Sequence, residues 1–182
     1  MKSNKALLTF GFFLVTGIGY SQLVPPSADS VLREATSRAE AEKKNVLIIF
    51  HASWCGWCHK MDSALNDPAC KKYFDANYVT RHLVVYESKD KKNLENAGVY
   101  ELLAKYHGTE EGIPFWLVFD KEGKLLADSE RRPGGTGTKG ENVGCPATAE
   151  EVQYFIDVLK KTSRISRAEE IAVEKRFRQN ED

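Results

Sequence analysis

The sequence lacks a net charge of either sign. Its 182 residues include 26 lysines and arginines against 26 aspartates and glutamates. A basic excess would favour nucleic acid as a partner, and an acidic excess would favour disorder. Hydrophobic residues make up 42% of the chain and charged residues 29%, a balance that fills one globular core. The composition therefore predicts one globular domain, expected as a monomer, that does not bind nucleic acid.

Cysteine is scarce too. Small folds that depend on disulfides are dense in cysteine, so a core of ordinary side chains must stabilise this domain. The cysteines are then available for chemistry. There are four: Cys55, Cys58, Cys70 and Cys145.

An apolar run of the length that spans a bilayer is also missing at the N-terminus. The run at 6–18 has about 13 residues, whereas a membrane helix needs roughly 20. Lys2 and Lys5 precede the run, and Gly19, Tyr20 and Ser21 follow it with small residues at the cleavage positions. This layout is typical of a secretory signal peptide at 1–21. We expect an exported, periplasmic protein, with a retained membrane anchor as the alternative.

Hydrophobic periodicity predicts an α/β domain at 22–162. Helices are expected at 28–44, 56–65, 69–77, 94–106 and 148–161, and strands at 46–50, 78–86, 113–120 and 125–128. This order implies a central mixed sheet flanked by helices. The segment 129–146 is expected to be a surface loop, although 135–140 matches G-x-G-x-x-G, because no helix begins there. The segment 163–182 is expected to be a charged, peripheral C-terminal tail.

The motif Cys55-Gly56-Trp57-Cys58 directly follows the strand at 46–50 and begins a helix. A structural zinc site needs four ligands, and a second cysteine pair is missing, so we expect no metal. With His59 the motif also fits haem attachment, but a haem would displace the core that the strands need. A redox dithiol is therefore the favoured interpretation, and a c-type haem protein remains an alternative.

The helix start explains why the first cysteine would react. Unpaired backbone N–H groups and the positive end of the helix dipole favour a thiolate there. Cys55 is therefore the expected nucleophile, exposed at the helix start. Cys58 lies one turn further and would attack the mixed disulfide, which releases the reduced partner.

The strand VLIIFHASW, the motif CGWC and the later segment GIPFWLVFDKEGK together resemble the thioredoxin superfamily over residues 28–161. The resemblance implies a thioredoxin fold and a cis bond before a proline that packs against the cysteines. It also implies a groove that binds the substrate, formed by Trp54, Gly56, Trp57, Ile113 and Pro114.

The activity that the resemblance implies is thiol–disulfide exchange with protein disulfides outside the cytoplasm, in the reducing direction. No cofactor is implied, and a membrane electron donor is a further expected partner. A binding module that keeps the fold without catalysis is the second functional hypothesis.

Several residues depart from the family pattern. Trp57 stands where thioredoxins have proline, and Ile49 stands where they have a buried aspartate, so another group must handle the proton of the resolving thiol. His51 replaces an aromatic residue and is expected either near the thiols or in a structural role. Cys145 is expected nearer the motif than Cys70, without a disulfide between these two.

Overall fold

The computed structural model describes residues 24–135 and 140–181. The expected signal peptide at 1–21 lies outside these residues, and so does the part of the glycine-rich stretch at 136–139. Within the described ranges, no helix is long and apolar enough to cross a membrane.

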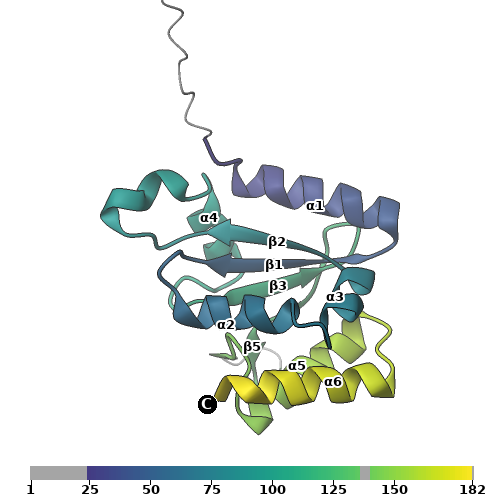
Figure 1. Cartoon of the computed structure of the whole chain (residues 1–182). Coiled ribbons are helices and arrows are strands. Elements are labelled where there is room, and N and C mark those ends of the chain that lie inside the picture. Colours follow the sequence, from purple (N-terminus) through teal and green to yellow (C-terminus); the bar gives the residue numbers. More distant parts are fainter. Residues whose placement is uncertain (1–23, 136–139, 182) are drawn as a thin grey trace, which may run out of the picture.

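A four-stranded mixed sheet forms the centre of the fold (Figure 1). Its strands are β1 (Asn45–His51), β2 (Tyr78–Val84), β3 (Phe115–Phe119) and β4 (Leu125–Asp128), in the order β2-β1-β3-β4. Strand β1 pairs parallel with β2 and antiparallel with β3. Residues 46–50 of β1 are all buried, as expected for an apolar run covered on both faces.

Helices cover both faces of the sheet, and the alternation of side chains along β1 separates two cores. One core lies under α1 (Ala28–Glu42) and α4 (Val99–Lys105). The other core lies under α2 (Gly56–Leu65), α3 (Lys71–Asn77), α5 (Ala149–Thr162) and α6 (Arg167–Arg178). The predicted α/β class, with a mixed sheet between helices, is confirmed.

Two segments that lie outside the predicted helices and strands carry short elements. The segment after β2 contains the 3-10 helix η1 (Lys89–Leu94), which projects from the end of the sheet where α2 begins (Figure 1). The segment 129–146 contains a two-stranded antiparallel ribbon, β5 (Glu130–Arg131) with β6 (Glu141–Asn142). In both cases backbone hydrogen bonds give a polar segment regular structure.

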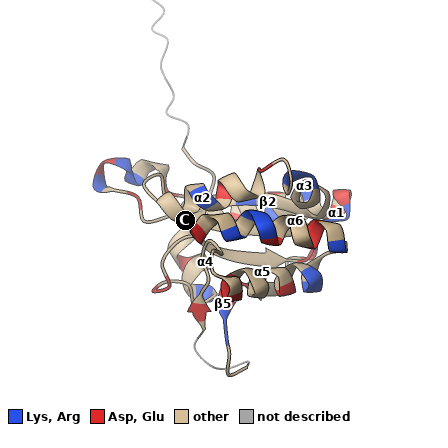
Figure 2. Cartoon of the chain, turned by 60° about the horizontal axis from the view of Figure 1, so that its bottom comes forward, with Lys and Arg blue, Asp and Glu red and all other residues tan. Residues whose placement is uncertain are grey.

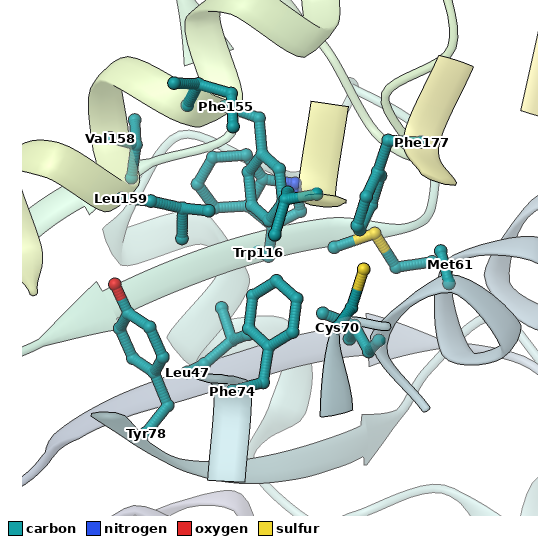
Figure 3. Close-up of a cluster of buried hydrophobic side chains, with 14 of the residues drawn as sticks. Leu47, Met61, Cys70, Phe74, Tyr78, Trp116, Phe155, Val158, Leu159 and Phe177 are labelled. Atoms are coloured by element: carbon teal, nitrogen blue, oxygen red, sulfur yellow. The ribbon is translucent and has the colours of Figure 1, made fainter. Parts of the chain in front are cut away.

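The C-terminal segment differs from the expected peripheral tail. Val173 and Phe177 of α6 are completely buried in the second core. The ring of Phe177 lies 4.9 Å from that of Phe155 and 6.3 Å from that of Phe74, measured between centroids (Figure 3). Basic side chains (lysine and arginine) and acidic side chains (glutamate) both line the rest of the helix (Figure 2). One narrow apolar stripe is therefore enough to attach a highly charged helix to the domain.

Candidate active site

The cysteine pair lies where β1 ends and α2 begins. Cys55 is the N-cap residue of α2, and its Sγ accepts a hydrogen bond from the backbone N–H of Cys58 at 3.1 Å. Cys55 and Cys58 form a disulfide with their Cα atoms 5.3 Å apart. The pair thus lies at the helix start, as the sequence predicts, with an N–H donor aimed at the first sulfur.

The expected exposure of Cys55 is wrong for this disulfide form. Cys55 is only 4% exposed, and Cys58 is 1% exposed. Both cysteines pack against Ala52 and Ile113. Trp54 and Trp57 are instead the prominent side chains of the motif, 60% and 49% exposed.

The predicted groove residues do not all share one surface. Trp57, Ile113 and Pro114 line one pocket of about 430 Å³, together with Gly144 and Cys145. The Ile113–Pro114 peptide bond is cis. The pocket's far wall comes from the segment that follows β6.

The other two predicted groove residues lie outside this pocket. Gly56 lines a separate, more polar pocket with His59 and Lys60. The indole Nε1 of Trp54 donates to the carbonyl oxygen of Tyr86 at 2.8 Å, on the side of η1. Trp54 and Trp57 therefore lie against different segments of the chain.

Sequence reasoning missed Glu87, which fixes the loop before the motif. Its carboxylate accepts from the backbone N–H of Ser53 at 2.5 Å and from the Ser53 hydroxyl at 2.9 Å. Burial alone would raise the pKa of Glu87, but the bonds from Ser53 and the nearby Lys91 hold it below its ordinary value. Only its position directly beyond a sheet strand could have drawn attention to it.

The remaining cysteines are buried thiols and are not bonded to each other, as predicted. Cys145 lines the pocket with Trp57 and Pro114, and the side-chain amide of Asn180 lies 3.3 Å from its Sγ. Cys70 packs in the second core near Met61 (Figure 3). Burial raises the pKa of Cys145 to about 12 and that of Cys70 to about 11, so both are protonated at neutral pH.

His59 would be the iron ligand if the motif attached a haem. Its Nε2 instead lies 3.0 Å from the carbonyl oxygen of Ser53, in the loop that precedes α2. Across the described ranges, no three His, Cys, Asp or Glu side chains are grouped so that they could hold a metal ion.

Gly144 supports the pocket from behind. It has φ of +58°, its carbonyl accepts from the indole Nε1 of Trp116 at 2.8 Å, and a Cβ there would lie 3.4 Å from the carbonyl oxygen of Pro114.

We expect Gly144→Ala to destabilise the fold by about 1–2 kcal/mol, because L-residues are strained at a positive φ. Thermal unfolding followed by circular dichroism measures the loss. Gly56→Ala is the control, since nothing lies within 4 Å of a Cβ there; equal melting temperatures for the two variants would contradict the prediction.

Comparisons with known proteins agree with this geometry. A family model described as thioredoxin-like matches residues 28–121, just over half of the chain. No curated protein matches the sequence.

Several solved structures are similar. The disulphide isomerase from Xylella fastidiosa Temecula1 is 21% identical, with 62% of this chain and 79% of that chain covered and a TM-score of 0.47. A DsbH oxidoreductase is 24% identical, with 87% and 95% covered and a TM-score of 0.44. The C-terminal domain of DsbD from Neisseria meningitidis in the oxidised form is 19% identical, with 75% and 97% covered and a TM-score of 0.44.

The family match covers α1, β1 with its cysteine motif, β2 and β3. The motif forms a disulfide at the start of α2. The chain therefore has the thioredoxin fold and belongs to the thioredoxin-like family.

Proposed function

We propose that this protein reduces disulfides of other proteins outside the cytoplasm, with Cys55 as the nucleophile and Cys58 as the resolving thiol. The observation that carries the proposal is the Cys55–Cys58 disulfide at the N-terminus of α2. Export is supported by the signal-peptide pattern at 1–21. The reducing direction is supported by Gly56 and Ile113, which resemble the corresponding residues of reductases.

The chemistry follows from the positions of the two sulfurs. In the reduced protein, the N–H of Cys58 and the positive end of the α2 dipole favour a thiolate at Cys55. This thiolate attacks one sulfur of the substrate disulfide, forms a Cys55–substrate bond and releases the other sulfur as a thiolate. Cys58 then loses its proton and attacks Cys55, which restores the Cys55–Cys58 bond and expels the second substrate sulfur. Two electrons thereby pass from the protein dithiol to the substrate.

Substrate binding is assigned to Trp54, Gly56, Trp57, Ile113 and Pro114. The two tryptophans of the motif offer exposed, rigid apolar surface. The carbonyl oxygen of Ile113 lies 3.6 Å from Cys55 Sγ. An extended substrate segment could therefore pair with this backbone while its cysteine reaches the sulfur.

Each catalytic cycle leaves the protein oxidised, so a reductase needs a supply of electrons. A membrane protein that passes electrons to the exported domain would meet this need. The chain would act as a monomer, and it needs no cofactor because the electron pair is carried by the sulfur atoms themselves.

A glutathione redox titration of the mature protein tests the proposal, with thiols trapped and located by mass spectrometry. We expect a reversible Cys55–Cys58 couple at roughly −270 mV, the value of a reductase. A couple at roughly −120 mV would overturn the direction, because such a protein oxidises its partners. The absence of any reversible couple between these two cysteines would overturn the function itself.

A further inference from the structure

Three of the four histidines in the chain gather around the start of α2. His51 ends β1, His82 lies in β2, and His59 follows Cys58 in α2 itself. Disulfide exchange, as described above, uses none of them. Their gathering beside a redox-active pair therefore calls for a physical explanation.

One of these histidines pairs with a carboxylate, and a second packs against the ring of the first. His82 Nε2 lies 2.7 Å from Asp62 Oδ1, and each side chain is about one-third exposed. An ionised carboxylate only accepts hydrogen bonds, so His82 donates through Nε2. The rings of His82 and His51 lie 4.9 Å apart, measured between centroids. Asp62, His82 and His51 thus form a continuous set of contacts, which we name the Asp62–His82–His51 cluster.

Both ends of this cluster adjoin the cysteines. Asp62 follows Cys58 by four residues in α2, so their Cβ atoms lie on the same helix face, roughly 5–6 Å apart. At the other end, His51 directly precedes Ala52, which packs against both Cys55 and Cys58. The cluster therefore links α2, one turn beyond Cys58, to the end of the strand that leads into the cysteine motif.

Burial and the titratable groups around His51 determine whether its imidazole is protonated. Burial lowers its pKa, and His82 and the more weakly acting His59 lower it further, while Asp62 and Glu87 act in the opposite direction. The net shift is downward from an ordinary value of about 6.5. His51 is consequently neutral at neutral pH, and a neutral imidazole can accept a proton.

We propose that the Asp62–His82–His51 cluster accepts the proton that Cys58 releases when it resolves the mixed disulfide. The S–H bond of Cys58 breaks, its sulfur bonds to Cys55, and the Cys55–substrate bond breaks with its electron pair on the substrate sulfur. The proton passes to His51, while Asp62 and His82 are positioning residues that act through the His51 ring. This inference rests on the proposed function, because it assigns a role within the same exchange cycle.

Stopped-flow tryptophan fluorescence separates the two steps, since Trp54 and Trp57 flank the disulfide. Reduced protein is mixed with a peptide disulfide, so that attack by Cys55 is second order and resolution by Cys58 is first order. We expect His51→Gln to slow resolution by about a hundredfold, the scale of general base catalysis, and to leave attack unchanged. In the wild type, the rate of resolution should fall only as the pH drops below about 6.5, the ordinary value from which the pKa of His51 is lowered, because a protonated His51 no longer accepts a proton; the variant should lose this inflection.

His82→Gln provides a second variant at a more exposed site, in case His51→Gln does not fold. It should slow resolution less, about threefold to tenfold, and shift the inflection rather than remove it. His107→Asn is the matched control, because His107 lies outside the cluster and asparagine tolerates its φ of +61°. The inference would be overturned if His51→Gln and His82→Gln, both folded, resolved the mixed disulfide at the same rate and with the same pH profile as His107→Asn. A wild type that fails to react with the disulfide would instead overturn the proposed function.

Discussion

Replacing Cys58 with serine is expected to stop the reaction at the mixed disulfide, with the partner bound covalently to Cys55. Serine keeps the backbone N–H that donates to Cys55 Sγ, so the nucleophile remains activated. Its hydroxyl, however, does not attack a disulfide at neutral pH.

The measurement combines steady-state turnover with non-reducing electrophoresis and mass spectrometry of the adduct. We expect turnover of a protein disulfide to fall by about a thousandfold or more, the order of loss that follows removal of an essential group. The trapped adduct should approach one partner per protein and should dissolve on addition of dithiothreitol. Its tryptic map should place the bond at Cys55.

Two variants serve as controls for this trap. Cys55→Ser should form no adduct, because the nucleophile is gone. Cys70→Ser should keep full turnover, since burial raises the pKa of this thiol to about 11 and it is not among the residues that line the pocket with Trp57 and Pro114. An adduct that forms through Cys58 in the Cys55→Ser variant would reverse the assigned roles.

The features that the sequence predicts well are those that depend on local pattern. The run at 46–50 indicates a strand because burial on both faces leaves no polar positions along it. The cysteine motif is informative for a similar reason, since its place between that strand and α2 gives Cys55 its N–H donors. These relations lie within a few residues, so they can be read directly from the chain.

The features that were missed depend on contacts between distant segments. The pairing of Asp62 with His82 follows from the register of β1 against β2, which sets His82 opposite Ile49. The tail was misread because Val173 and Phe177 are few among many charges, and their burial requires aromatic rings supplied by α3 and α5. A local signal was nevertheless present. Ser166 and Glu169 form a capping box, with the spacing that marks a helix start.

Phe177→Ala is expected to destabilise the protein by about 3–5 kcal/mol, the cost of a cavity left by a buried phenylalanine. The ring is fully buried and packs 4.9 Å from that of Phe155, so its removal leaves a space that the neighbours cannot fill completely. For a domain of this size, the melting temperature should fall by roughly 6–20 °C. Urea unfolding, followed by circular dichroism, measures the change in the free energy of unfolding.

Ile171→Ala is the matched control on the same helix. This side chain is 49% exposed, so its truncation should change the free energy of unfolding by no more than about 0.5 kcal/mol. If Phe177→Ala proved equally mild, α6 would be a peripheral attachment, as its charged sequence suggested. A large difference between the two variants would instead establish that the C-terminal helix is part of the domain core.

The same helix also holds the active-site helix in place. Arg176 pairs with Asp67 at 3.0 Å, beyond the end of α2. In η2 (Gln179–Glu181), the carbonyl oxygen of Asn180 accepts from Lys60 Nζ at 2.9 Å, and its side-chain amide donates to the carbonyl oxygen of Pro146 at 3.1 Å. Loosening α6 therefore releases contacts to α2 and to the wall of the pocket at once. We accordingly expect Phe177→Ala to slow disulfide reduction at temperatures where the protein is still folded, whereas Ile171→Ala should leave the rate unchanged.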